Sequence, residues 1–150
     1  MDAYQAPNSD LTTDNKRLFK PVKAVLYGLS IAFFLTTIVS TIVVIALGII
    51  SGADMSNEGA VNTLFAGNPL FMFIDLVLSG WILYFAGSVV GKHTQGKEIK
   101  YAIIVSALML IIVTPLFVLT ESFSTYPMWY SLSSLVIVPV GIYFGAKSKI

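Results

Sequence analysis

The sequence predicts an all-α membrane protein in which four transmembrane helices form an antiparallel bundle, with both termini on the cytoplasmic side. Only 11% of the 150 residues are charged and 56% are hydrophobic, whereas a soluble domain carries about 25% charged residues. Four apolar runs are each long enough to cross about 30 Å of hydrocarbon as helices. All nine lysine and arginine residues fall on one side of the membrane when these runs are taken as spans.

The overall composition also excludes several kinds of partner and site. The net charge is +1, so no global field would attract nucleic acid. The chain has no cysteine, which excludes disulfides and thiolate metal sites. We therefore expect a protein whose main partner is the lipid bilayer, without a cofactor or a bound metal.

The first elements along the chain are a tail and a long span. Residues 1–23 are polar and basic and are predicted to form a disordered cytoplasmic tail. Residues 24–50 contain no charge and form the first predicted span. This run exceeds the roughly 7–15 apolar residues of a signal peptide, so we interpret it as a retained anchor. Cleavage near Ser51-Gly52-Ala53 is the alternative.

Three further spans complete a transmembrane domain predicted over residues 24–147. The second covers residues 69–91 and contains Asp75, the only charged residue between Glu58 and Lys92. The third covers residues 101–120 without a charge. The fourth covers residues 126–146 and is entered through Pro127. Because the connections are short, sequential spans are expected to pack as antiparallel neighbours.

The loops differ sharply in charge, and this difference predicts the orientation. Basic residues occur before the first span, between the second and third spans and after the fourth: Lys16, Arg17, Lys20, Lys23, Lys92, Lys97, Lys100, Lys147 and Lys149. The other two loops carry only Asp54, Glu58 and Glu121. The positive-inside rule then places both termini in the cytoplasm. Lys92, Lys97 and Lys100 are expected to contact anionic lipid head groups, at about 1 kcal/mol each.

Asp75 is the one ionisable residue inside a predicted span. It lies roughly 8 Å below the outer interface, and Thr114, Ser131 and Ser134 fall at the same depth on the third and fourth spans. We therefore predict an intramembrane polar cluster of Asp75, Thr114, Ser131 and Ser134, held by hydrogen bonds between helices. Three interpretations of Asp75 remain: a protonated side chain bound to hydroxyls, a proton or cation site, and a carboxyl that reaches lipid or the interface.

Small residues form stripes on two of the spans. Gly80, Gly87 and Gly91 share a face of the second span, and Gly141 and Gly145 share a face of the fourth. Such stripes permit close helix packing, either within one bundle or in a dimer. Residues 83–87 also resemble residues 142–146, through shared interface composition or through duplication of two halves.

Two segments carry a resemblance to known proteins. Residues 2–11 resemble an Asn-Pro-Tyr-x-x-Pro-x-Ser opening, with Asp2-Ala3 in place of Asn-Pro and with Tyr4 and Pro7 retained. The turn of residues 87–92, followed by a polar linker and another span, is also similar to small uncharacterised four-span bacterial inner-membrane proteins. The resemblance implies a bacterial inner membrane and no particular activity.

No catalytic pattern is present. Paired histidine ligands, paired intramembrane carboxylates and phosphate-binding glycine loops are all missing, so we expect no enzyme activity. The leading hypothesis is a protein that acts by contact, as an accessory or assembly subunit or an immunity-type protein, with a membrane-protein partner or as a homo-oligomer. The alternative is a small transporter or channel subunit that uses Asp75 as a proton or cation site. Since four spans enclose little space, this alternative would require oligomers.

Overall fold

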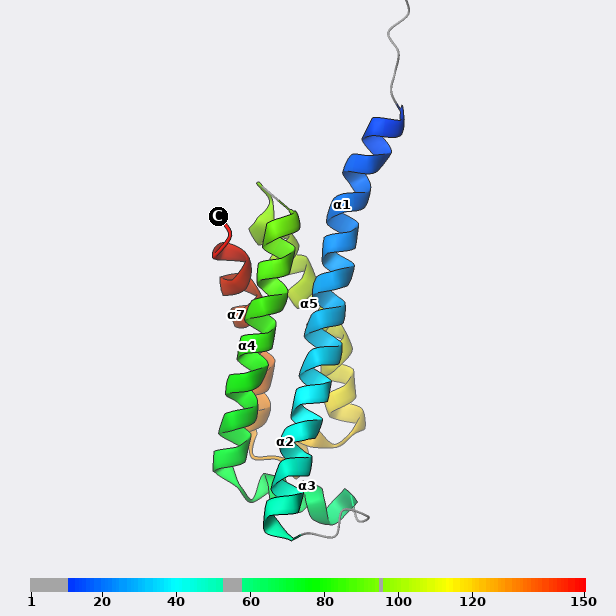
Figure 1. The fold of residues 1–150 in the computed structure, drawn as a ribbon. Helices are drawn as coiled ribbons and strands as arrows, with labels where there is room; N and C mark the ends of the chain where they lie inside the picture. Colours follow the sequence, from blue (N-terminus) through cyan, green and yellow to red (C-terminus); the bar gives the residue numbers. More distant parts are fainter. Residues whose placement is uncertain (1–10, 53–57, 95) are drawn as a thin grey trace, which may run out of the picture.

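The structure, a computed structural model, describes residues 11–52, 58–94 and 96–150. The described residues are almost entirely helical and contain no strand, which confirms the all-α class (Figure 1). In chain order the elements are α1 (Leu11–Ser30), the π-helix η1 (Ile31–Leu35), α2 (Thr36–Ser51), α3 (Glu58–Ala66), α4 (Pro69–His93), α5 (Glu98–Leu119), α6 (Ser122–Thr125) and α7 (Met128–Lys147).

Four of the described helical segments are long and apolar enough to cross a membrane, as predicted: 21–51, 69–93, 98–119 and 128–147. Each begins or ends within a few residues of the corresponding predicted span. Capping explains the start of α4, because the Asn68 side chain accepts a hydrogen bond from the Phe71 amide and Pro69 occupies the first helical position. The first span ends at Gly52, which adopts a left-handed conformation with φ 65°.

The structure differs from the predicted disordered tail. Residues 1–10 lie outside the described part of the chain, but residues 11–23, also expected to be disordered, are helical. α1 begins at Leu11 and continues into the first span, and it extends past the ends of the other helices (Figure 1). Extending an existing helix avoids the cost of nucleation, so the adjoining span favours helix in this polar segment.

The outer surface of the bundle is strongly apolar. Large hydrophobic side chains such as Ile49, Trp81 and Leu119 are 70–78% exposed. A soluble monomer rarely exposes contiguous apolar surface on this scale. Helices satisfy their own backbone groups, so a bundle with this surface is suited to lipid as its solvent.

The closest helix pair does not join neighbours in sequence. Successive spans alternate in direction (Figure 1), so α4 and α7 run parallel. These two helices nevertheless make the most extensive contact in the molecule, while α4 and α5, which are sequential, pack much less closely. Sequential antiparallel spans do contact each other, as predicted, but the parallel pair α4 and α7 packs more extensively than any of them.

Glycines account for the close approach of α4 and α7. A Cβ atom on Gly87 would collide with the Ile142 carbonyl oxygen, and one on Gly145 with that of Tyr84. At Gly91 it would lie 2.8 Å from the Ala146 carbonyl oxygen. Gly141 and Gly80 border the same interface, against Leu83 and Ile137 respectively. All five glycines predicted for helix packing thus lie between α4 and α7.

The similar segments 83–87 and 142–146 face each other in this interface, through the contacts of Gly87 with Ile142 and of Gly145 with Tyr84. Both segments therefore have the same packing role, one on each helix of the pair. The first span packs on the other side of α4: α1 contacts α4 and α5, whereas α2 contacts α4 and α3.

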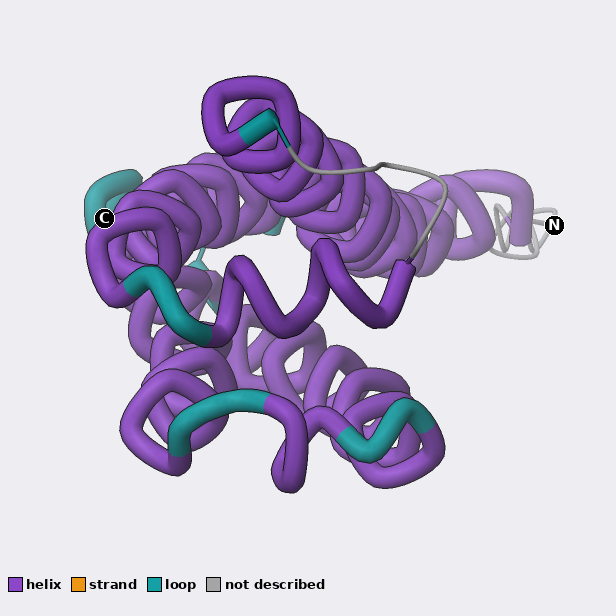
Figure 2. The backbone as a smooth tube through the Cα atoms, turned by 90° about the horizontal axis from the view of Figure 1, so that it is seen from below, coloured by secondary structure: helices purple, strands orange, loops and turns teal. Residues whose placement is uncertain are grey.

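The connections gather at two ends of the bundle. We call the end that carries α3 and α6 the α3 end, and the opposite end, which carries the α4–α5 turn and the C-terminus, the basic end. α3 crosses the α3 end between α2 on one side and α7 and α5 on the other (Figure 2). Two core clusters result, one nearer the basic end around Leu83, Val90 and Ile142 and one nearer the α3 end around Leu47, Phe65 and Met72.

Candidate functional site: an acidic cavity within the bundle

A cavity of about 570 Å³ lies inside the α3 half of the bundle. All four spans contribute to its wall, together with α3, α6 and Tyr126. Most of the wall is apolar, with Phe33, Met109 and Phe117 among its side chains. Its polar side chains are Thr36, Thr37, Ser40, Thr41, Asn62, Asp75, Ser79, Ser122, Tyr126, Tyr130 and Ser134. No lysine, arginine or histidine occurs among the described residues that line it.

The cavity is open on the side between α2 and α5. Among the lining residues, those of α4 and α7 are mostly buried, including Asp75, Leu83 and Val138. The exposed lining residues are Thr37, Thr41 and Ile45 on α2, Leu116 on α5 and Asn62 on α3. Those on α2 and α5 lie on membrane spans, so the side between these helices faces the bilayer interior, whereas Asn62 lies at the α3 end.

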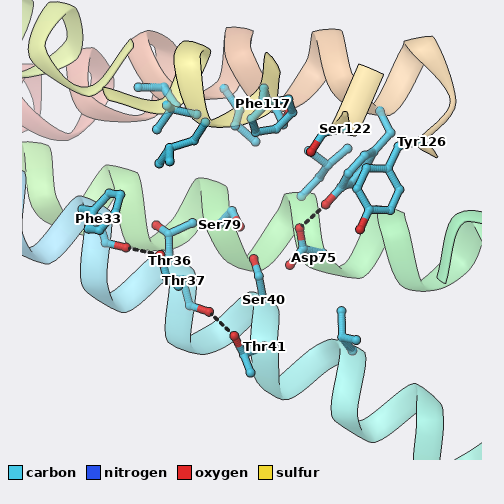
Figure 3. A pocket seen from close by; sticks show the side chains of 18 of the residues that line it. Phe33, Thr36, Thr37, Ser40, Thr41, Asp75, Ser79, Phe117, Ser122 and Tyr126 are labelled. Atoms are coloured by element: carbon cyan, nitrogen blue, oxygen red, sulfur yellow. Dashed lines mark hydrogen bonds between the residues drawn. The ribbon is translucent and has the colours of Figure 1, made fainter. Parts of the chain in front are cut away.

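Asp75 provides the only acidic side chain among the described residues of this wall. It is 4% exposed, and its Oδ2 accepts a hydrogen bond of 2.8 Å from the Tyr130 hydroxyl of α7. Its Oδ1 is buried and has no hydrogen-bond partner among the described residues. One carboxylate oxygen is thus held by the protein while the other is left without a donor beside the cavity (Figure 3).

Three aromatic rings surround the Tyr130 side of the carboxyl. Phe65 of α3, Tyr126 and Tyr130 pack edge to face, with ring centroids 5.6–5.9 Å apart. This geometry is the favoured one for aromatic pairs. The Tyr126 hydroxyl also lies 3.5 Å from Asn62 Oδ1. The cluster fastens α3 to α7 next to Asp75.

Hydroxyl side chains of the first span face Asp75 across the cavity. Thr36 Oγ1 is buried and, within the described chain, has no hydrogen-bond partner. Figure 3 shows the Thr36 and Ser40 oxygens on the side of the helix that faces Ser79 and Asp75 of α4. Thr37 and Thr41, nearer the opening, instead donate to the carbonyls of Phe33 and Thr37 at 2.8 Å. Such local bonds leave these two hydroxyls without a spare proton to donate.

The π-helix η1 lies where the first span begins to line the cavity. Ala32 and Phe33, within η1, are part of the wall, and Thr36 follows η1 directly. A π turn places more residues in a turn than the α-helix does, and so rotates the residues after it. We attribute the inward position of Thr36 and Ser40 to this rotation.

The predicted polar cluster is only partly assembled. Asp75 and Ser134 line the same cavity, but Ser134 Oγ donates to the Ser131 carbonyl at 2.8 Å rather than to Asp75. Ser131 is fully buried, and its Oγ has no partner among the described residues and is not part of the cavity wall. Thr114 is exposed on α5 and lies outside the cluster. Equal depth did not bring Thr114 to Asp75, because its face of α5 is turned away from α4 and α7.

The three lysines predicted to contact lipid head groups lie at the basic end. Lys92, Lys97 and Lys100 are exposed around the α4–α5 turn. This turn is stabilised locally, since the Glu98 carboxylate accepts a hydrogen bond of 2.6 Å from the Gly96 amide. Lys147 and Lys149 are exposed at the same end of the bundle (Figure 1). Their side chains are therefore accessible at the surface of this end of the bundle.

Sequence reasoning missed Tyr130, Thr36 and α3. Tyr130 lies four residues before Ser134 and eleven before Gly141, on the stripe that packs against α4, and this spacing is the signal in the sequence that could have identified it. Thr36 and Ser40 are likewise four residues apart, but the π-helix η1 before them is not evident from the sequence.

The cavity does not resemble a metal centre. Across the described ranges, no three histidine, cysteine, aspartate or glutamate side chains are grouped to hold a metal ion. A single carboxylate with hydroxyls and aromatic rings is instead suited to a positively charged group, through charge and cation–π attraction. Comparison of the sequence with protein-family models and curated proteins, and of the fold with solved structures, found no match.

Proposed function

We propose that this protein is a non-enzymatic, multi-pass protein of a bacterial inner membrane that binds a positively charged ligand at Asp75. In this proposal both termini are cytoplasmic and the α3 end faces outward, as the basic residues at the opposite end favour. The protein would act as a binding or transport subunit. The cavity lies within one chain, so binding would not depend on the oligomers expected from the sequence.

One observation carries the proposal: Asp75 Oδ1 is buried beside the cavity without a partner in the described chain. An ionisable residue in a span costs about 2.5–3.5 kcal/mol on insertion scales, so such residues tend to be paired or functional. Here no basic side chain on the wall neutralises the carboxylate. A bound cation would supply both the charge and the missing donor.

A second candidate retains the contact function expected from the sequence, and the opening between α2 and α5 favours it. A transmembrane helix of a partner protein could seat against the exposed face of Ile45 and Leu116. A basic side chain on that helix would then pair with Asp75. The glycine faces are less suited to such a contact, because α4 and α7 bury them against each other.

The test compares cation binding by wild-type protein and by Asp75→Asn in lipid nanodiscs. Sodium, tetramethylammonium, tetraphenylphosphonium and dodecyltrimethylammonium serve as probes, with empty nanodiscs as the lipid background. At least one probe is expected to bind Asp75→Asn at least about tenfold more weakly, equivalent to about 1.4 kcal/mol. Asparagine can still accept the Tyr130 hydrogen bond, so the variant is expected to fold. Equal binding of every probe to both proteins would refute the ligand-binding function.

A further inference from the structure

We propose that the ligand is an amphiphilic organic monocation that enters the cavity from the bilayer, between α2 and α5. This inference rests on the proposed function and adds the chemical class of the ligand and its route. The size of the cavity, the separation of its polar and apolar walls and the position of its opening each support it.

The size favours an organic ligand over a bare metal ion. Pockets for small organic molecules span about 300–1,000 Å³, and this cavity has about 570 Å³. A dehydrated alkali or alkaline-earth ion needs six or more oxygens at short distances. Asp75 is the only carboxylate on the described wall, and no group of three acidic or histidine side chains in the described ranges could hold a metal ion.

The wall offers different chemistry to the two parts of an amphiphile. Near the α3 end, Asp75 Oδ1 and the rings of Tyr126 and Tyr130 would hold a positive head group, by charge and by cation–π attraction. Towards the basic end and along α5, the wall includes Met109, Val113 and Phe117 with Leu83 and Val138 opposite, and its polar groups there are hydroxyls such as those of Thr36 and Ser79. That largely apolar and uncharged half would hold an alkyl or aryl tail. The single negative charge matches a monocation.

The opening selects a ligand that partitions into lipid. Its described rim consists of Thr41 and Ile45 on α2 and Leu116 on α5, all exposed on the sides of membrane spans. At the α3 end, α3 lies across the bundle (Figure 2), and the Phe65, Tyr126 and Tyr130 rings pack together, while Asn62 is the exposed lining residue of α3. A ligand already dissolved in the bilayer would reach Asp75 without crossing this aromatic cluster.

The first experiment tests the ligand class in nanodiscs. Dodecyltrimethylammonium is compared with tetramethylammonium, which lacks the tail, and with dodecyldimethylamine oxide, which has the same chain and no net charge near neutral pH. Wild-type protein is expected to bind dodecyltrimethylammonium at least about tenfold more tightly than either compound, and Asp75→Asn is expected to lose this preference. If tetramethylammonium or sodium binds equally well in an Asp75-dependent way, the inference is overturned and the proposed function stands. If no probe depends on Asp75, both fail.

The second experiment tests the route with a matched pair of variants. Ile45→Trp places a bulky side chain on the rim, whereas Ile49→Trp places it one turn further along the same exposed face, outside the cavity wall. Rapid-mixing measurements are expected to show that Ile45→Trp slows both association and dissociation of dodecyltrimethylammonium about tenfold, with Ile49→Trp unchanged. Entry between α2 and α5 would be contradicted if both variants associated with the probe at the wild-type rate. It would also be contradicted if Ile45→Trp lost affinity while its association rate stayed unchanged.

Discussion

Asp75 is held at one oxygen and unsatisfied at the other. The Tyr130 hydroxyl donates to Oδ2, while Oδ1 has no donor in the described chain. A hydrogen bond to a charged group contributes about 1.5–3 kcal/mol, which at best offsets the cost of placing the carboxyl in a span. The site is therefore poorly optimised for stability alone, as expected of a side chain retained for binding.

Tyr130→Phe should destabilise the protein, because it removes the one donor to Asp75 and keeps the ring in place. We expect a loss of about 1–2 kcal/mol in the free energy of unfolding, within the range of hydrogen bonds between membrane helices and to charged groups. Denaturation in mixed micelles would measure it. Tyr84→Phe on the exposed face of α4 is the control and should change the stability little. Equal stability of Tyr130→Phe and wild type would show that the bond contributes nothing.

At the scale of elements, α4 and α7 form the most closely packed side of the cavity, and the first span forms the opposite side. Glycine lets the backbones of α4 and α7 meet, with Gly87 against the Ile142 carbonyl and Gly145 against the Tyr84 carbonyl. The close approach of the two backbones allows favourable dispersion contacts and weak Cα–H···O hydrogen bonds between them. In lipid such contacts drive helix association, because the hydrophobic effect does not act between helices there. Because Asp75 and Tyr130 lie on these two helices, the same interface sets the distance between them.

Gly145→Ala should separate α4 from α7, since its Cβ would collide with the Tyr84 backbone, which cannot move independently. We expect about 1–3 kcal/mol of destabilisation, as for other overpacked sites, and weaker cation binding through displacement of Tyr130. Gly80→Ala is the control on the same interface. There the new Cβ would lie 2.9 Å from the flexible end of Ile137, so the cost should be small. Equal effects of the two substitutions, measured by denaturation, would refute the role of backbone contact.

At the scale of the whole molecule, charge is distributed unequally between the two ends. The exposed lysines around the α4–α5 turn and the C-terminus lie at the basic end, whereas Glu121 is exposed at the α3 end (Figure 1). From the positive-inside rule we propose that the basic end is cytoplasmic. In that orientation the cavity would lie in the outer half of the membrane, and a ligand from the outer leaflet would reach it first.

The orientation can be measured by cysteine labelling, because the chain has no cysteine of its own. We expect Ser124→Cys, on the exposed surface of α6, to react with a membrane-impermeant maleimide on intact spheroplasts. Ile150→Cys, at the exposed C-terminus, should react only after the membrane is permeabilised. The reverse pattern would invert the orientation and would place the cavity in the cytoplasmic half.

Composition, span length and the order of charged residues were sufficient to predict the four helices. The bilayer requires a similar minimum number of apolar residues in every spanning helix, and lysine and arginine are enriched in the cytoplasmic loops. The sequence also singled out Asp75 and the glycine stripes. Side-chain depth could be counted, but the direction of each side chain around its helix could not. For that reason Thr114 was assigned to the cluster, and Tyr130 and Thr36 were not.

The sequence by itself determined that this protein has four helices long and apolar enough to cross a membrane, with Asp75 as the one acidic residue within the predicted spans. Only the tertiary structure decided that the parallel helices α4 and α7 pair most closely, which brings Tyr130 to Asp75. It also decided that α2 stands away from α5, so that the polar faces enclose a cavity open to lipid. The physical reason is that span formation depends on the local transfer of apolar residues into lipid. Helix pairing depends instead on how well two helix surfaces fit together. The glycine stripes could equally have joined two chains, but in this structure those of α4 and α7 pack against each other within one chain.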